Sequence, residues 1–194
     1  MEKLIIVGAG GFGRVVLEHA VKEYKCVFID DGIPEGTIVD GATVVGKVLE
    51  LGKFLDYKNL IVAIGDNCLR EQIYYKAKKL GFSFPNIIHP SVYISPYASV
   101  GSGCVFLNNV VIQNNSHCGN GVILNPGVEL HHDSFVDDYS LIYTNSVIRS
   151  STHVGKRVWI GSNVTISTQG FVFDDGIIED NRNLTNFENT SKNT

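Results

Sequence analysis

The sequence predicts two joined folds: a small Rossmann-like α/β domain over residues 1–84, and a left-handed parallel β-helix of hexapeptide repeats over residues 85–175. Three observations carry this prediction. A strand, a glycine-rich loop and a helix follow one another at the N-terminus. An apolar residue recurs at every sixth position across the C-terminal part. Glycine supplies 20 of the 194 residues, or about 10% against a usual value of about 7%. Residues 176–194 are polar and predict a flexible tail.

The N-terminal domain is predicted from apolar strands that alternate with helices. Strands are expected at residues 3–7, 26–30 and 60–64, and helices at 14–22 and 68–80. This alternation implies a parallel sheet, in which ligands bind at the carboxyl ends of the strands. The loops that follow the three strands, at residues 8–13, 30–32 and 65–67, should therefore converge.

The first of these loops, Gly8–Gly13, has the spacing Gly-x-Gly-x-x-Gly between a strand and a helix. Such a loop offers backbone N–H groups and a helix N-terminus to phosphate. Asp30 follows the second strand and is placed to bind ribose or base hydroxyls. Because the domain has only half the strands of a full dinucleotide fold, we expect a mononucleotide diphosphate rather than NAD. The alternative is that the glycines only allow close packing of helix on strand.

The β-helix is predicted from a period of six residues. Every sixth residue from Ile88 to Val172 is apolar, and a small or β-branched residue usually follows four positions later. This period fits neither a free helix nor a free strand, and a glycine-rich β-sandwich would not keep it. Three hexads would form one triangular coil, with the aliphatic side chain inside. Glycines after the aliphatic residue are expected at the corners: Gly101, Gly119, Gly155 and Gly161.

Stacked coils place residues that are 18 apart directly above one another, about 4.8 Å apart. Side chains should therefore form columns, which include Asn114, His132 and Ser150; His117, Phe135 and His153; and Gln113, His131 and Arg149. The flat faces of such a solenoid favour association, and we expect a homotrimer.

Charge and composition exclude several classes of function. The net charge of −4 argues against nucleic-acid binding, which needs a basic surface. No apolar run approaches about 18 residues, so we expect no membrane insertion and a cytoplasmic protein. The four cysteines show no paired spacing, which predicts neither a disulfide framework nor a zinc site.

Four motifs together resemble the NeuD/PglD family of sugar O- and N-acetyltransferases. They are the Gly-rich loop, Phe28-Ile-Asp-Asp31, Ala63-Ile-Gly-Asp-Asn67 with Arg70 on the next helix, and Gly121-Val-Ile-Leu-Asn125 leading to His132-Asp133. The resemblance covers residues 1–172. It implies that a nucleotide-linked sugar is bound by Gly10, Gly11, Phe12, Asp30, Asp31 and Gly65.

The resemblance also implies that His132 is the catalytic residue and that Asp133 lies beside it. A neutral imidazole is suited to remove a proton from the acceptor, and a carboxylate can hold its tautomer. Direct attack on acetyl-CoA then needs no metal. His131 is the alternative base, but neighbours on an extended chain point in opposite directions. The three-histidine zinc site of γ-type carbonic anhydrases is a further alternative, although no short His-x4-His spacing is present.

Two departures from the family concern the acetyl donor. A second family histidine, nine residues beyond the base, is Leu141 here, and the repeat is expected to stop near Val172, short of the family's later coils. Gly161 and Ser162 are then the expected remnant of the acetyl-CoA contact. The predicted function is acetyl transfer from acetyl-CoA to the amino group of a nucleotide-linked sugar in bacterial surface-glycan synthesis. The alternatives are O-acetylation of sialic acid or another sugar, and a sugar-nucleotide-binding protein with a degenerate donor site.

Overall fold

In the computed structural model, which describes residues 1–184, the chain divides into two compact units. The first is Met1–Ile87 and the second begins at Ile88, a few residues after the boundary predicted at residue 84. No helix within the described residues is long and apolar enough to cross a membrane.

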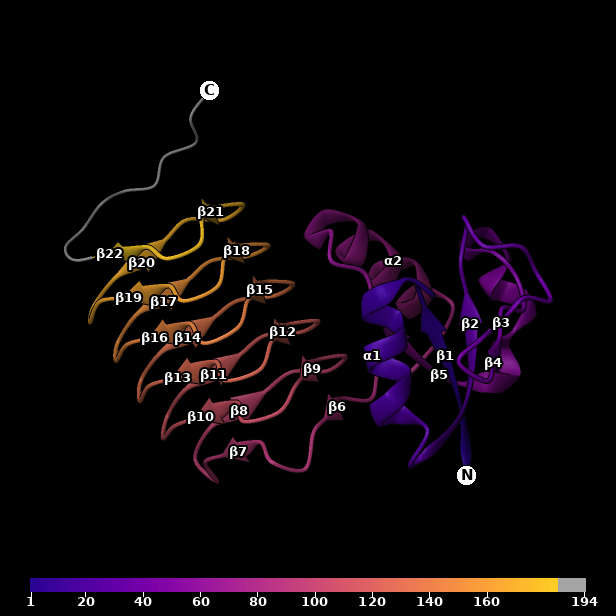
Figure 1. The fold of residues 1–194 in the computed structure, drawn as a ribbon, viewed down its shortest axis with the longest axis horizontal. Helices are drawn as coiled ribbons and strands as arrows, with labels where there is room; N and C mark the ends of the chain where they lie inside the picture. The colour runs from indigo at the N-terminus through magenta and orange to yellow at the C-terminus, as the bar shows by residue number, and fades with distance from the viewer. Residues whose placement is uncertain (185–194) are drawn as a thin grey trace. The chain divides into compact units, whose positions relative to one another are not determined.

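The first unit contains a three-stranded parallel sheet with strand order β2-β1-β5 (Figure 1). Helix α1 packs on β1 and β2, and α2 packs on β5. A short antiparallel hairpin and two 3-10 helices, none of which was predicted, connect β2 to β5. In chain order the elements are β1 (Glu2–Val7), α1 (Gly11–Ala20), β2 (Tyr24–Ile29), β3 (Ile38–Val39), β4 (Ala42–Thr43), η1 (Val48–Lys53), η2 (Leu55–Tyr57), β5 (Asn59–Val62) and α2 (Asn67–Lys79).

The three strands and two helices predicted for this unit are confirmed, with one notable shift. Helix α1 begins at Gly11 rather than at residue 14, because the end of the Gly-rich loop forms the first helical turn. The sheet core is apolar throughout: Leu4, Ile5 and Ile6 of β1 have no exposed surface. Burial on both faces is expected for the central strand of a parallel sheet.

The second unit is a left-handed parallel β-helix built from two-residue strands in three sheets (Figure 1). The first sheet contains β7 (Tyr93–Ile94), β10 (Val111–Ile112), β13 (Glu129–Leu130), β16 (Val147–Ile148), β19 (Thr165–Ile166) and β22 (Asn183–Leu184). The second contains β8 (Ser99–Val100), β11 (His117–Cys118), β14 (Phe135–Val136), β17 (His153–Val154) and β20 (Phe171–Val172). The third contains β6 (Ile87–Ile88), β9 (Val105–Phe106), β12 (Ile123–Leu124), β15 (Leu141–Ile142), β18 (Trp159–Ile160) and β21 (Ile177–Ile178).

The period of six is confirmed strand by strand. Each predicted aliphatic position from Ile88 to Val172 is the second residue of a strand. Each such residue pairs with the one 18 positions away, as Ile112 does with Leu130. From Phe106 onward these side chains fill the interior of the solenoid as one continuous buried cluster, against which the partly buried Ile94 and Val100 pack.

The prediction that the repeat stops near Val172 is wrong. Strands β21 and β22 continue the third and first sheets, and Ile178 and Leu184 keep the aliphatic position of the period. The polar residues between them are compatible with the repeat, because they occupy its turns. Residues 176–184 therefore belong to the solenoid, and the rest of the predicted tail, 185–194, lies outside the described residues.

The corners of the coil are also placed differently from the prediction. A residue with positive φ occurs at every sixth position from Gly103 to Asn181, three residues after each aliphatic one. Most of these residues are Asn, Asp or other non-glycine types, as at Asn115 (φ 57°) and Asp133 (φ 60°). Asn and Asp tolerate this left-handed conformation better than most residues.

The glycines expected at the corners instead make room for the next coil. Asp174 Oδ1 accepts a hydrogen bond from the backbone N–H of Lys156 at 2.9 Å, and its carboxylate lies over Gly155. A Cβ on Gly155 would lie 2.5 Å from that oxygen. The same relation joins two other glycine–aspartate pairs, Gly119 with Asp138 and Gly161 with Asp180. Part of the glycine excess is therefore required by side-chain caps between coils.

We expect Gly155→Ala to destabilise the β-helix by about 1–3 kcal/mol, because the added methyl group overlaps both the Asp174 carboxylate and its backbone. Trp159, the single tryptophan, lies in β18 and reports on this unit alone. Urea unfolding followed by its fluorescence measures the change. Arg149→Ala puts alanine at the same position of another hexad and serves as the control. An equal midpoint for the two variants would contradict the packing argument.

Candidate active site

The three loops at the carboxyl edge of the sheet lie together, as predicted. Gly8 N–H donates to the carbonyl of Ile29 at 2.9 Å, and Ala63 N–H donates to the carbonyl of Val7 at 2.8 Å. Asp30 Oδ2 accepts from Ala9 N–H at 2.7 Å, which ties the second loop to the first. The backbone thus brings the ends of β1, β2 and β5 to one place.

The Asp30 carboxylate connects the first two loops through hydrogen bonds to their backbone. Its Oδ1 accepts from the N–H groups of Gly32 at 2.8 Å and Ile33 at 3.0 Å, in addition to the Ala9 bond on Oδ2. An ionised carboxylate offers about four acceptor positions, so one remains for a ligand hydroxyl. The neighbouring Asp31 accepts from Val48 N–H at 2.8 Å, at the start of η1. The sequence did not predict this bracing role.

The glycines of the first loop divide into two kinds. Gly8 has φ +100°, and a Cβ on it would lie 2.9 Å from the carbonyl oxygen of Ala63. A Cβ on Gly13 would overlap the carbonyl oxygen of Gly8, so backbone conformation and close packing require both glycines. Gly10 and Gly11 are exposed, and a Cβ on either would meet nothing within 4 Å. Packing therefore explains only half of the motif. The other half leaves an open approach to the helix N-terminus.

Helix α1 begins with features that suit an anion. Its N-cap residue is Gly10, which supplies no side-chain cap, and no acidic residue lies in the first turn. The first N–H groups of a helix lack intrahelical partners, and the helix dipole favours negative charge there. Gly10, Gly11 and Phe12 are thus able to present backbone N–H groups to a phosphate.

The third loop is shaped by a buried arginine. Arg70 is 1% exposed; it donates to the carbonyl of Ile64 at 2.8 Å and to Asn67 Oδ1 at 2.7 Å. These bonds hold the backbone on both sides of Gly65, which is exposed and has open space around its Cα. Asp66 caps α2 by accepting from Leu69 N–H at 2.9 Å.

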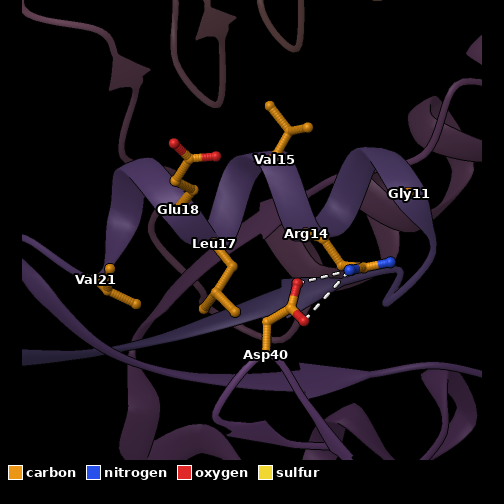
Figure 2. A pocket seen from close by; sticks show the side chains of 7 residues that line it. All are labelled: Gly11, Arg14, Val15, Leu17, Glu18, Val21 and Asp40. Atoms are coloured by element: carbon orange, nitrogen blue, oxygen red, sulfur yellow. Dashed lines mark hydrogen bonds and ion pairs between the residues drawn. The ribbon is translucent and has the colours of Figure 1, made fainter.

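A hollow of about 430 Å³ lies beside α1 at the turn between β3 and β4, and Figure 2 shows Arg14 and Asp40 pointing toward each other there. Their ion pair measures 2.7 Å. Of the predicted nucleotide-binding residues only Gly11 lines this hollow, so it is not the place where the three loops meet. Its lining is Gly11, Arg14, Val15, Leu17, Glu18, Val21 and Asp40.

In the β-helix, His132 and Asp133 lie in the turn between β13 and β14. His132 Nδ1 is 2.6 Å from Asp133 Oδ2, and the two side chains are 58% and 46% exposed. The second oxygen, Oδ1, accepts from Asn115 Nδ2 at 2.6 Å. These hydrogen bonds, first from Asn115 and then from His132, lower the pKa of Asp133 below its ordinary value. The arrangement leaves His132 Nε2 facing away from the carboxylate and able to accept a proton.

Two other histidines also face carboxylates. His131 Nε2 lies 3.3 Å from Glu129 Oε2, and its side chain is 28% exposed, half as much as that of His132. His153 Nε2 lies 3.0 Å from Asp137 Oδ2. The sequence did not indicate this last pair, because its members are 16 residues apart and meet only through the turn of the coil. No cluster of metal-ligating side chains is present within residues 1–184.

The predicted aromatic column is confirmed. His117, Phe135 and His153 pair across adjacent coils of the second sheet. Their ring centroids are 5.0 and 5.8 Å apart. Phe171 extends the column at 5.1 Å from His153.

Comparison with known proteins identifies the family of this chain. Residues 3–77 match the PglD N-terminal domain family. GDP-perosamine N-acetyltransferase of Escherichia coli O157:H7 is 28% identical over 142 residues, which are 69% of this chain and 64% of the relative. The chain thus spans less than two thirds of the length of this curated relative.

Two solved structures extend the comparison to nearly the whole chain. The acetyltransferase domain of PglB from Neisseria gonorrhoeae FA1090 is 32% identical with a TM-score of 0.89, covering 95% of this chain and 92% of that one. The chain belongs to the NeuD/PglD family. A histidine-to-alanine mutant of GDP-perosamine N-acetyltransferase from Caulobacter crescentus, in complex with CoA and GDP-perosamine, is 27% identical with a TM-score of 0.81. It covers 100% of this chain and 98% of that one.

In this NeuD/PglD protein the backbone N–H groups of the two residues predicted to contact the acetyl donor are already hydrogen-bonded within the solenoid. Gly161 N–H donates to Ile178 and Ser162 N–H donates to Asp180 Oδ1, because the solenoid continues past Val172. The prediction for this pair therefore rests on the Ser162 hydroxyl. Leu141, where the family has its second histidine, has no polar group for acetyl-CoA. It is also 3% exposed and pairs with Ile123 and Trp159 of the neighbouring coils.

We expect Gly13→Ala to lower the stability of the first unit by a few kcal/mol, about 2–4, because its Cβ overlaps backbone that cannot move away. Gly11→Ala, two residues earlier in the same helical turn, should leave the thermal midpoint unchanged. Differential scanning calorimetry of the two variants makes the comparison. Equal destabilisation would show that both glycines serve packing alone.

Proposed function

We propose that this NeuD/PglD protein transfers the acetyl group of acetyl-CoA to the amino group of a nucleotide-linked amino sugar. The observation that carries the proposal is the exposed His132 with the Asp133 carboxylate on its Nδ1. The family relatives support it: one is named a GDP-perosamine N-acetyltransferase, and a solved relative contains CoA and GDP-perosamine.

His132 is the general base of the proposed reaction. Asp133 accepts the Nδ1–H, so that the lone pair is on Nε2. The sugar amine attacks the thioester carbonyl as Nε2 removes its proton. A C–N bond forms, the C–S bond breaks, and the imidazolium returns the proton to the departing CoA sulfur. Proton transfer of this kind typically contributes a factor of about 10²–10⁴.

The nucleotide part of the substrate binds at the loops of the first unit. The open N-terminus of α1, at Gly10, Gly11 and Phe12, receives the diphosphate. Asp30, with one acceptor position left, and Asp31 bind hydroxyls of the nucleoside, and the exposed Gly65 lets the ligand approach the backbone.

The acetyl donor binds at the β-helix in this proposal, where Ser162, beside Gly161, contacts acetyl-CoA. The protein acts as a homotrimer, which the exposed aromatic rings on the second sheet support: Phe135 is 43% and Phe171 47% exposed. It works in the cytoplasm in bacterial surface-glycan synthesis, because nucleotide sugars and acetyl-CoA are cytoplasmic metabolites. O-acetylation of sialic acid or another sugar is the alternative reaction.

A second candidate, a sugar-nucleotide-binding protein with a degenerate donor site, is favoured by the buried Leu141 and the occupied amides of Gly161 and Ser162. Calorimetric titration with acetyl-CoA distinguishes the two candidates. Saturable binding supports the enzyme, and absence of binding at millimolar acetyl-CoA supports the binding protein.

We expect His132→Ala to lower kcat by a factor of about 10²–10⁴, with the fold and nucleotide binding unchanged because the side chain is exposed. His131→Ala is the matched control and should retain activity within a few-fold. Acetylation is measured as release of the CoA thiol. Turnover of His132→Ala at the level of the control would contradict the assignment of the base.

We also expect a nucleotide-linked amino sugar to raise the thermal midpoint of the protein. A ligand at about 100 times its Kd stabilises the folded state by about 2.7 kcal/mol. GDP-, UDP- and dTDP-linked sugars, each compared with its free nucleotide, identify the base and show whether the sugar contributes. If no nucleotide shifts the midpoint, the assignment of the glycine loops is wrong.

A further inference from the structure

The carboxylate of Asp133 is held from two sides. Oδ2 faces His132 Nδ1 at 2.6 Å, and Oδ1 accepts from the side-chain amide of Asn115 at 2.6 Å. Both distances are slightly shorter than the about 2.7–2.9 Å that is usual for a charge-assisted hydrogen bond from nitrogen to a carboxylate. Asn115 is thus linked to His132 through a single carboxylate.

The contact between Asn115 and Asp133 results from the stacking of successive coils. Asn115 lies in the turn between β10 and β11, and Asp133 lies in the same turn one coil later, 18 residues farther along the chain. The strands on both sides of the two turns pair in register. Asn115 and Asp133 have φ of 57° and 60°. Two matching left-handed corners therefore stack, and their side chains leave the backbone in parallel.

We propose that Asn115 is a positioning residue of the acetyl-transfer reaction, which orients the Asp133 carboxylate so that Oδ2 stays on Nδ1 of His132. This inference rests on the proposed role of His132 as the base. Asn115 itself contacts neither the proton that is moved nor the acetyl group.

The physical argument starts from exposure. Asp133 is 46% exposed, so without a second partner its carboxylate would rotate freely and exchange His132 for water. The terminal torsion of Asp has broad wells and restrains the group little. The amide of Asn115 fixes Oδ1, and the planar carboxylate then directs Oδ2 toward the imidazole. This bond is also the largest cause of the lowered pKa of Asp133.

The other titratable groups near this turn do not offer the same support. His131 precedes His132 and faces Glu129 on β13 at 3.3 Å. Arg149 follows His131 by one coil. Gln113 and Asn114 act on the backbone alone: Gln113 Oε1 accepts from the N–H of His132 at 3.2 Å, and the Asn114 carbonyl accepts from the N–H of Asp133 at 3.1 Å. None of these contacts acts on the Asp133 carboxylate, as the Asn115 bond does.

The test variant is Asn115→Gly, because glycine adopts a left-handed corner without strain and removes only the amide. Asn145→Gly is the matched control: Asn145 is an exposed corner asparagine with φ 58°, and the corner residues one coil before and after it are Gly127 and Asn163, neither of which is an aspartate. We expect Asn115→Gly to lower kcat about tenfold, the lower end of the loss that follows when the hydrogen-bond partner orienting a metal-bound histidine is removed, with KM for both substrates unchanged. Asn145→Gly should match the unmodified protein.

Two further measurements separate positioning from a general structural effect. The pKa of Asp133, followed by carboxylate 13C NMR, should rise toward its ordinary value in Asn115→Gly and stay low in Asn145→Gly. The double variant Asn115→Gly/Asp133→Asn should be no slower than Asp133→Asn alone, because effects that pass through one group are not additive.

The inference is overturned if Asn115→Gly keeps the kcat of the control while His132→Ala is inactive. It is also overturned if the pKa of Asp133 does not move, or if the double variant is about tenfold slower than Asp133→Asn. An active His132→Ala would instead overturn the proposed function, and this inference with it.

Discussion

The hydrogen-bonded register between residues 18 apart is the constraint on which the β-helix and its histidine site depend. Each short strand donates to and accepts from the same position of the next coil, as the pairing of His117, Phe135 and His153 shows. Two-residue strands have no stability alone, so the ladder and the aliphatic interior form together. Once that register is set, every outward side chain has a fixed neighbour above and below it.

The register explains both the close packing of glycines under aspartates and the hydrogen bond that holds the partner of His132. Where an aspartate caps the coil before it, as Asp174 caps Lys156, the residue beneath must be glycine. Where an asparagine lies under an aspartate at a left-handed corner, as Asn115 lies under Asp133, the two form a short hydrogen bond instead. The same geometric relation thus serves stability in one turn and holds a histidine partner in another.

In the first unit, glycine shapes the loop between β1 and helix α1. Gly8 is needed for its positive φ and Gly13 because helix α1 lies close to the Gly8 carbonyl, whereas Gly10 and Gly11 leave the helix N-terminus open. Asp30 then joins the loops by accepting three backbone N–H groups. A rigid loop with an uncapped helix end is preorganised for an anion, because the donors are already oriented when the ligand arrives.

The sequence by itself determined the two folds, the position of each aliphatic side chain of the solenoid from Ile88 to Val172, and the adjacency of His132 and Asp133. These features depend on periodicity and on local motifs, which a linear chain displays. The tertiary structure decided what depends on contacts between distant residues: which glycines pack and which stay open, the Arg70 support of the Gly65 loop, and the coils beyond Val172. Contacts between coils require knowledge of which corner stacks on which, and only the folded solenoid supplies it.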